Sequence, residues 1–390
     1  MQLSKAQITE ILSVIASRED GFNELLQITF EALMQSERRE HLQRIEGDNG
    51  NGYRNVRAYG NGKMLELRVP RTRDGNFHPI LLTLLRDQEE ESRKIAFELY
   101  GAGLTTQQVG GVFEKLYGRH YSKSSVSRMF DYAREEVLNW LERPLDDYYP
   151  IIYLDALFWS TRRDGCVSKE AYYTLLGVKC DRTREVLGIV NSPTESASSW
   201  EEVFRGLKNR GVENIGLLVA DGLNGLETAA ARTFVGTPFQ KCVVHLERNV
   251  LGRIKPSDKK AVGAALREVF LTDHKDDSPE QGWGRWEDFL ETWRKRYPSL
   301  KVYLDKERYY AHFTYLNYHY KTRTMIYSTN WIERLNRDFK RTLKMRGVMP
   351  DPVSVLFLLG KVALSKLAYE RKVPNLNYEQ KRFLWMEKDY

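Results

Sequence analysis

Residues 151–159 form a run of large apolar side chains that a single acid, Asp155, interrupts. A run of this length, rich in isoleucine, leucine and aromatic residues, predicts a strand buried within a sheet. A carboxylate inside such a strand costs free energy unless a hydrogen bond or a cation compensates its charge. The run therefore predicts a buried sheet and leaves two interpretations of Asp155, a structural hydrogen bond or a metal ligand.

Strand and helix patterns alternate after this run. Residues 171–180 and 185–190 predict two further strands, which form an antiparallel meander with the first. The chain then predicts a helix at residues 198–209, a strand at 215–220, a helix after Gly222 and a short strand at 241–244. The order β-β-β-α-β-α-β-α is that of the ribonuclease-H-like topology, so the sequence predicts an α/β core with a mixed sheet.

A second acid, Asp221, directly follows the predicted strand at residues 215–220. The carboxyl end of a strand is where an α/β sheet presents ligand-binding groups. Either Asp155 or Asp221 alone could be a helix cap or a turn residue. At the ends of strands that we expect to be neighbours, the two acids are better explained as one shared site.

A third acid, Glu333, lies near the start of a helix that Ser328, Thr329 and Asn330 can cap. At about 100° per residue, the apolar residues of this helix fall on one side. The other side carries Glu333, Asn336 and a basic stripe expected to bind DNA, which consists of Arg337, Lys340, Arg341 and Lys344. In an isolated helix this pattern indicates a solvated charged face. An acid that precedes a basic stripe instead suits a metal ion held beside a phosphate backbone.

Asp155, Asp221 and Glu333 are therefore the predicted catalytic and metal-binding residues. Three neighbouring carboxylates raise one another's pKa unless a cation is present. Hard oxygen ligands with open water positions suit Mg²⁺, with Mn²⁺ as a substitute. Two such ions about 4 Å apart can activate an attacking hydroxyl and stabilise the departing oxygen at phosphorus. The predicted chemistry is phosphodiester hydrolysis and transesterification.

Cys242 and His245 form a Cys-x-x-His pair just after the last predicted strand. As zinc ligands they would need two further partners, and neither Cys166 nor Cys180 has an evident mate in the sequence. We therefore favour a supporting role beside the active site, in which His245 contacts a phosphate or orients a neighbouring carboxylate. Asn336 has a similar expected role.

The N-terminal part of the chain predicts three segments. Residues 1–46 have a helical pattern, and residues 47–84 predict a small β-hairpin DNA-binding unit with exposed arginines, among them Arg71 and Arg73. Residues 85–144 predict three helices, the last of which begins with polar and basic residues expected to bind DNA, namely Lys123, Ser124, Ser125, Ser127 and Arg128. This order is typical of a helix-turn-helix that reads the major groove, although an ordinary three-helix bundle gives the same spacing.

The remaining chain predicts a catalytic domain that is interrupted once. Residues 145–250 and 327–370 form the expected core, residues 251–326 an all-helical insertion, and residues 371–390 a tail. The segment at 309–320 is rich in tyrosine and histidine. Most of these rings are expected to pack within the insertion, while the alternative is that some stack on unpaired bases.

Charge and cysteine usage limit the class of protein. A net charge of +7 suits a polyanionic partner such as DNA. No run approaches the roughly 20 apolar residues of a membrane span, so we expect no membrane association. Three scattered cysteines argue against a disulfide framework. We expect a cytoplasmic protein that associates with the nucleoid.

Three separated motifs resemble those of the bacterial mutator-type insertion-sequence transposases. They are DGLNGL at residues 221–226, QKCVVHLERN at 240–249 and NWIERLNR at 330–337. Further matches are YLDA at 153–156 and VPRTRDGNF at 69–77. The resemblance spans nearly the whole chain, and the motifs occur in the family's order.

The resemblance implies a DNA transposase in which Asp155, Asp221 and Glu333 are the family's acidic triad and the segment between Asn249 and Thr329 is its helical insertion. It also implies binding of double-stranded DNA with terminal inverted repeats, transfer to a target DNA, and a homodimer on DNA. The alternatives are a structure-selective nuclease or junction resolvase on the same fold, and a DNA-binding regulator without catalysis. The presence of all three acids disfavours the regulator.

Overall fold

The computed structural model describes residues 13–15, 18, 21–45, 47–60, 63–117, 123–192 and 197–364. The chain separates into two compact units, Met1–Ala133 and Arg134–Tyr390. The division falls within helix α5 (Lys123–Leu141), before the boundary that the sequence predicts at residue 144. The expected C-terminal tail at 371–390 lies outside the described residues.

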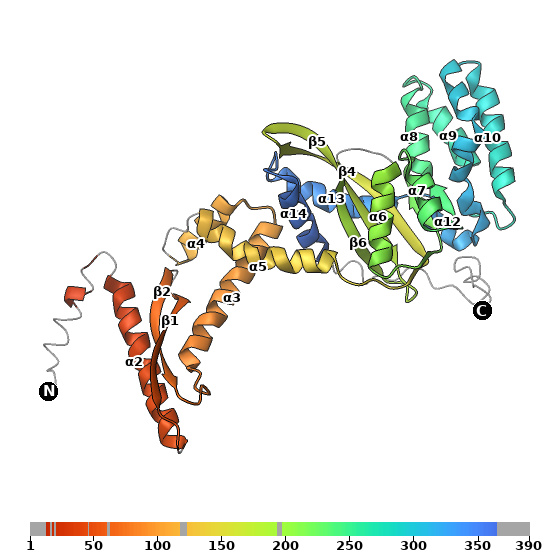
Figure 1. The fold of residues 1–390 in the computed structure, drawn as a ribbon. Helices are drawn as coiled ribbons and strands as arrows, with labels where there is room; N and C mark the ends of the chain where they lie inside the picture. Colours follow the sequence, from red (N-terminus) through yellow and green to blue (C-terminus); the bar gives the residue numbers. More distant parts are fainter. Residues whose placement is uncertain are drawn as a thin grey trace, which may run out of the picture. The chain divides into compact units, whose positions relative to one another are not determined.

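The N-terminal unit combines a hairpin with helices (Figure 1). Strands β1 (Gly50–Gly60) and β2 (Lys63–Thr72) pair antiparallel, which confirms the predicted hairpin. The helices are α2 (Gly21–Arg44), α3 (Ile80–Gly101) and α4 (Thr106–Tyr117), followed by α5. Leu82 and Leu85, one helical turn apart, pack against the hairpin in the same cluster as Met34 of α2. Helix α3 already begins at Ile80, and its first turns pack against the hairpin. The domain boundary predicted between residues 84 and 85 therefore lies inside a helix.

The second unit is built on a five-stranded mixed sheet in the order β6-β5-β4-β8-β9. Strands β4 (Ile151–Arg163), β5 (Cys166–Val178) and β6 (Arg184–Ser192) are antiparallel, as the sequence predicts. Strands β8 (Leu218–Ala220) and β9 (Phe239–Lys241) are parallel to β4. Two-residue strands β3 (Tyr148–Tyr149) and β7 (Asn214–Ile215) form a separate parallel pair.

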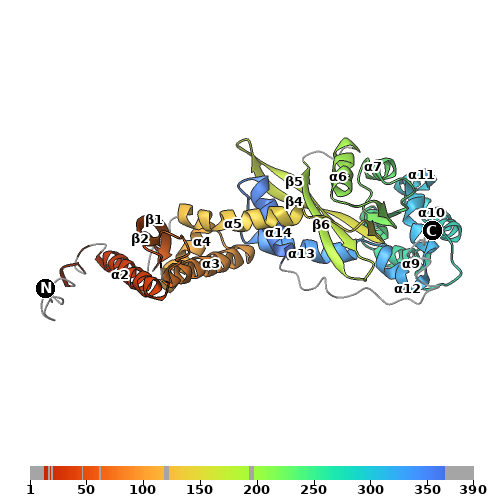
Figure 2. The ribbon, with the colours of Figure 1, turned by 60° about the horizontal axis from the view of Figure 1, so that its bottom comes forward.

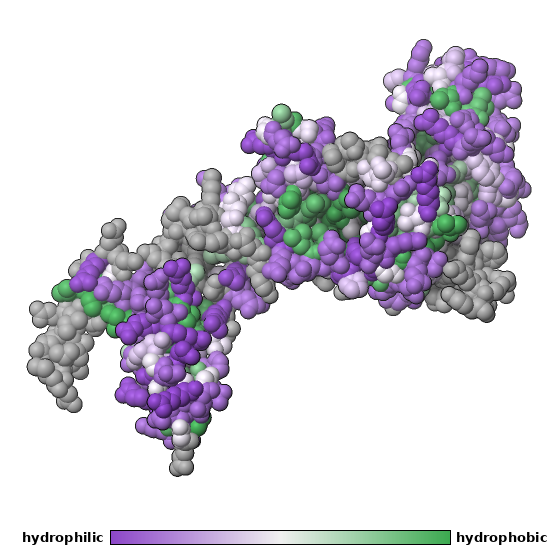
Figure 3. All heavy atoms as spheres, in the orientation of Figure 1, coloured by the Kyte–Doolittle hydropathy of each residue, from purple (hydrophilic) through white to green (hydrophobic). Residues whose placement is uncertain are grey.

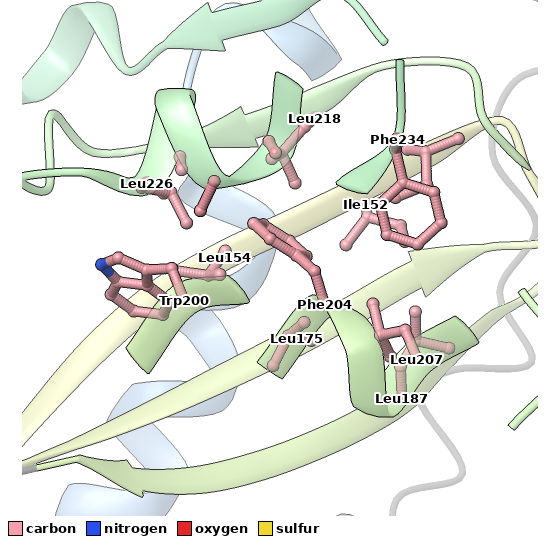
Figure 4. Close-up of a cluster of buried hydrophobic side chains, with 14 of the residues drawn as sticks. Ile152, Leu154, Leu175, Leu187, Trp200, Phe204, Leu207, Leu218, Leu226 and Phe234 are labelled. Carbon is pink, nitrogen blue, oxygen red and sulfur yellow. The ribbon is translucent and has the colours of Figure 1, made fainter. Parts of the chain in front are cut away.

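Helices cover both faces of the sheet (Figures 1 and 2). One face carries α6 (Ala197–Asn209) and α7 (Leu226–Thr233), and the other carries α13 (Asn330–Lys344) and α14 (Pro352–Leu364). Figure 4 shows Ile152 and Leu154 of β4 packed with Trp200 and Phe204 of α6. Because side chains alternate along a strand, the intervening residues of β4 face α13 instead.

The predicted single strand at residues 215–220 is divided at Gly216. A Cβ atom at this position would lie 2.6 Å from the carbonyl oxygen of Pro150, so only glycine permits this approach of the two backbones. The strand predicted at residues 241–244 is wrong beyond Lys241. Cys242 is the N-cap residue of α8 (Val243–Gly252), whose residues Val243, Leu246 and Val250 are buried at helical spacing.

All regular secondary structure of the predicted insertion is helical. It contains α9 (Lys259–Val269), α10 (Pro279–Arg294), α11 (Lys306–Tyr309) and α12 (Tyr320–Ile326), together with three short 3₁₀ turns, Pro298–Leu304, Tyr310–His312 and Thr314–Asn317. Ser278 and Gln281 form a capping box that starts α10. Phe313, Tyr315 and Tyr318 are buried, so packing is the confirmed role of these aromatic residues of the segment at 309–320.

Two surface properties complete the fold. In the part of the chain that the structure describes, no helix is sufficiently long and apolar to traverse a bilayer. The face shown in Figure 3 is mostly hydrophilic, and a hydrophobic area lies between α14 and β6. Leu356 of α14 and Ile189 and Val190 of β6 line a hollow there.

Candidate active site

The sheet brings two of the three predicted acids to equivalent positions on neighbouring strands. Leu154 of β4 pairs in register with Ala220 of β8, and Asp155 and Asp221 are the next residues of the two parallel segments. Side chains at equivalent positions of parallel strands lie on the same face of a sheet. Asp155 and Asp221 therefore leave the sheet on the face that α13 covers.

Asp155 is 9% exposed and is held by a side chain of α13. Asn336 Nδ2 donates a hydrogen bond of 2.8 Å to its Oδ2 atom. Burial raises the pKa of Asp155 to about 6, and the charge of Glu333 adds to this increase. A hydrogen bond from the backbone nitrogen of Ala156, the positive charge of His245 and the Asn336 hydrogen bond act in the opposite direction, in decreasing order of effect. The carboxyl group therefore changes charge near neutral pH, which is typical of functional sites.

Asn336 does not lie on the exposed side of α13, where the sequence analysis put it. The residue is 4% exposed, and its Oδ1 atom has no hydrogen-bond partner in the described part of the chain. A helical projection at about 100° per residue puts Asn336 on the same side as the basic residues. The hydrogen bond to a carboxylate compensates the burial of the amide, which allows Asn336 to join Ile332, Leu335 and Phe339 against the sheet.

Glu333 lies in the first turn of α13 and faces α8. Its Oε1 and Oε2 atoms lie 3.3 and 3.5 Å from Nη1 and Nη2 of Arg248. The Glu333 side chain is 25% exposed and that of Arg248 is 57% exposed, so solvent screens this pair. Arg248 is the functional-site neighbour that the sequence analysis missed. It follows His245 by three residues on one helix, a spacing that puts both side chains on the same face and could have revealed it.

Cys242 and His245 connect the two helices that carry the site. The buried Cys242 Sγ accepts hydrogen bonds from the backbone nitrogen and the hydroxyl of Thr329, at 3.4 and 3.3 Å. These bonds fix the N-terminus of α13 against the N-terminus of α8. The positive ends of two helix dipoles thus lie beside the acids, where they favour negative charge.

His245 lies close to Asp221 and interacts electrostatically with Asp155. Its Nδ1 atom is 3.8 Å from Oδ1 of Asp221. Interaction with the Cys242 side chain and the negative charges of Asp221 and Asp155 raise the pKa of His245 to about 9, although burial opposes this increase. A protonated imidazole at this place partly neutralises the carboxylates, as a supporting residue would.

The described residues contain no group of three or more histidine, cysteine or acidic side chains arranged closely enough to hold a metal ion. The three acids share one neighbourhood, but Glu333 is paired with Arg248, and Asp221 Oδ1 accepts from the backbone nitrogen of Gly222. The donor set itself, three carboxylates beside an amide, suits a hard divalent cation rather than zinc. Binding of such an ion at these acids stays a prediction.

The predicted DNA-binding residues lie at several places. Arg337, Lys340, Arg341 and Lys344 are exposed along α13, and Arg71, Arg73 and Ser127 are exposed in the N-terminal unit. The side chains of the remaining predicted residues of α5, which are Lys123, Ser124, Ser125 and Arg128, lie outside the described part of the chain.

Comparison with known proteins points to one family. Residues 2–371 match the family model described as "Transposase, Mutator family". The chain is 29% identical to the transposase for insertion sequence element IS905 of Lactococcus lactis, covering 88% of this chain and 89% of that protein. It is 30% identical to the transposase for insertion sequence element ISRM3 of Rhizobium meliloti, covering 96% of this chain and 95% of that protein.

Two further matches extend this comparison. The transposase for insertion sequence element IS256 in transposon Tn4001 of Staphylococcus aureus is 28% identical, covering 91% of this chain and 93% of that protein. Among solved structures, the Drosophila P element transposase strand transfer complex gives a TM-score of 0.28 at 12% identity, covering 70% of this chain and 78% of that chain. A TM-score this low carries no argument about the fold.

Proposed function

The chain belongs to the Mutator family of transposases, and we propose that it is a DNA transposase that binds the inverted-repeat ends of an insertion sequence and cuts and rejoins DNA strands there. The observation that carries the active-site part of this proposal is the register of the sheet. Asp155 and Asp221 follow the paired residues Leu154 and Ala220, and Asn336 of α13 reaches Asp155.

We propose that the sheet with its helices is a ribonuclease-H-like core. The strand order β6-β5-β4-β8-β9, with three antiparallel strands followed by two parallel ones, supports this assignment. The intervening helices α6 and α7 lie on one face and α13 and α14 on the other, as a two-sided α/β core requires. The segment at 251–326 is then the insertion, and residues 327–364 return to the core.

Asp155, Asp221 and Glu333 would hold Mg²⁺, or Mn²⁺ as a substitute. When bound, such ions would lower the pKa of an attacking water or 3′ hydroxyl and stabilise the departing oxygen. Glu333 can join the other acids only after it exchanges its contact with Arg248 for the metal ion. Because solvent screens the Glu333–Arg248 pair, this exchange costs little free energy. Asn336 holds the Asp155 carboxylate in one orientation, and His245 offsets negative charge when no cation is bound.

DNA contacts would come from both units. The exposed basic stripe of α13 begins one turn beyond Glu333 and suits the phosphates next to the scissile bond. The N-terminal unit, with Arg71, Arg73 and the start of α5, would read the terminal repeat. We further propose that the protein acts as a homodimer on DNA, because two element ends must be brought to one target DNA, and that it works in the cytoplasm at the nucleoid.

The decisive experiment compares Asp155→Asn with Asp164→Asn in cleavage and joining of a pre-cut element end. Asp164 lies in the turn between β4 and β5, so its replacement is a matched control in the same hairpin. We expect Asp155→Asn to bind element ends and lose both reactions, while Asp164→Asn keeps them. Full activity of Asp155→Asn with Mg²⁺ would remove this acid from the site. Hydrolysis without joining in the unaltered protein would favour the alternative, a structure-selective nuclease or junction resolvase.

A further inference from the structure

A cavity of about 690 Å³ lies beside Asp221, between the sheet and the helical insertion. We propose that this cavity receives one unpaired nucleotide of the DNA strand on which the enzyme acts, with its base against tyrosine rings of the insertion and its phosphate at two arginines. Natural small-ligand pockets enclose roughly 300–1,000 Å³, so the volume suits one nucleotide. We call it the nucleotide cavity. The inference rests on the proposed function and adds a subsite to it.

The insertion side of the nucleotide cavity is aromatic. The rings of Tyr309 and His312 are stacked with centroids 5.8 Å apart, and Tyr303 meets Tyr309 edge-on at 5.1 Å. All three residues line the cavity. Tyr309 is only half-buried, unlike Phe313 and Tyr315, which complete the packing of the insertion. A partly exposed aromatic ring at a polar cavity is a platform on which any base can stack.

Two arginines supply positive charge to the same cavity. Arg253 and Arg308 both line it and both are exposed. The third cation, Lys241, is already paired with Glu227 at 2.7 Å. By contrast, the structure shows no carboxylate of a described residue paired with either guanidinium. Arg253 bonds through Nε to the Tyr303 hydroxyl at 3.2 Å, and this bond orients its side chain beside the aromatic wall. A guanidinium held in this way is suited to a phosphate.

The cavity also contains groups that can bond to the edge of a base. Burial lowers the pKa of His312 to about 3, so the ring is neutral. Its Nδ1 atom lies 2.9 Å from the carbonyl oxygen of Tyr309 and donates to it, which makes Nε2 a hydrogen-bond acceptor. Asn224 and Asn249 line the cavity with amides that donate and accept. Hence the lining offers stacking, phosphate binding and edge recognition together.

The position of Asp221 at the nucleotide cavity determines which nucleotide enters the cavity. Asp221 lines the cavity and also belongs to the proposed acidic trio. A scissile phosphate near the trio therefore has its neighbouring nucleotide within reach of the cavity. That nucleotide must leave its base pair to stack on Tyr309. Loss of pairing at the scissile position costs a few kcal/mol, which stacking and phosphate contacts offset.

The test is a coupling experiment with the full chain and duplexes that carry the terminal repeat and its flanking DNA. Each nucleotide around the scissile phosphate is replaced in turn by an abasic site. The opposite strand carries an abasic site at the same position in both the test and the reference duplex, so that the cost of unpairing does not differ between them. Affinity is measured with Ca²⁺ instead of Mg²⁺. Base stacking contributes about 1–3 kcal/mol, so one abasic position should weaken binding by the unaltered protein about tenfold. The same abasic site should change binding by Tyr309→Leu less than about twofold, since the base has then lost its platform.

Matched control variants distinguish loss of a contact in the nucleotide cavity from a general loss of folding. Tyr310→Leu removes the neighbouring ring, which does not line the cavity, and should keep the full abasic effect. Arg308→Gln should weaken binding of the element end, whereas Arg294→Gln, also exposed on the insertion, should not. These exposed positions keep the test valid if Tyr309→Leu fails to fold.

The outcomes distinguish the cavity from the proposed function. Specific binding of element ends without a sensitive abasic position, or with the same abasic effect in Tyr309→Leu, overturns the nucleotide cavity alone. Equal binding of element ends and unrelated DNA by the unaltered protein overturns the proposed function, and the cavity assignment with it.

Discussion

Replacement of Asn336 by alanine should move the pH dependence of DNA cleavage to higher pH. Asn336 Nδ2 donates the 2.8 Å hydrogen bond to Asp155, whose pKa is about 6 because the carboxyl group is buried. A hydrogen bond to a charged group contributes about 1.5–3 kcal/mol, and one pKa unit corresponds to about 1.4 kcal/mol. Losing the donor should therefore raise the pKa of Asp155 by about one to two units.

The sign of the effect follows from which form of Asp155 acts. The proposed role requires the ionised carboxylate, so activity falls as the pH drops through the pKa of Asp155. In the unaltered protein this fall is centred near pH 6. In Asn336→Ala the fall should be centred about one to two units higher, so that cleavage at pH 7 drops while cleavage at pH 9 recovers.

The assay is the initial rate of end cleavage between pH 5 and pH 9 at Mg²⁺ concentrations well below saturation, because a bound cation would itself hold Asp155 in the ionised form. Asn330→Ala is the control, because this asparagine is exposed at the start of the same helix and touches neither acid. Its profile should match that of the unaltered protein. An unchanged acid limb in a folded Asn336→Ala protein would refute the assigned link between the amide and Asp155. Equal loss of activity at every pH would show that Asn336 acts only through packing.

Three further predictions concern single contacts. Arg248→Gln should tighten Mn²⁺ binding up to about fivefold in calorimetric titration, because a screened ion pair with Glu333 contributes at most about 1 kcal/mol. Weaker Mn²⁺ binding would contradict the idea that Glu333 must leave Arg248 before it binds the ion. Burial alone would raise the pKa of Glu185, but hydrogen bonds from a tyrosine and an arginine hold it below the usual range. Glu185→Gln should therefore lower the melting temperature at pH 7. This difference should shrink as the pH falls below the ordinary glutamate pKa and vanish below the lowered pKa of the folded protein; a constant difference would refute this. Gly216→Ala should cost about 1–3 kcal/mol in denaturant unfolding because its Cβ meets a backbone carbonyl, whereas Gly206→Ala, with open space around it, should not.

The sheet could be predicted because its strands carry strong local signals. The long apolar run around Asp155 and the two strands after it confirm the predicted meander, since buried strands need continuous apolar side chains. Residues 241–244 were harder, because the three apolar residues that follow Lys241 fit a strand or a buried helical turn equally well. The structure decides in favour of helix α8 through contacts with distant residues, among them Thr329.

The acids could be chosen from the sequence, but their partners could not. Asp155 and Asp221 stand out as carboxylates at buried strands, a costly arrangement that needs an explanation. The hydrogen bond of Asn336 depends on how α13 docks on β4, which periodicity alone does not encode. The pairing of Arg248 with Glu333 joins two helices that are separated by the whole insertion. Contacts of this kind require the tertiary fold.

Calorimetric titration with Mn²⁺ tests the central claim most directly, using the unaltered protein and the single variants Asp155→Asn, Asp221→Asn and Glu333→Gln. If the three carboxylates act as one metal site, each replacement should weaken binding at least about tenfold, because each removes a charged oxygen ligand. Asp164→Asn should bind as the unaltered protein does. Unchanged affinity in any of the three variants, with the fold intact, would contradict a shared site.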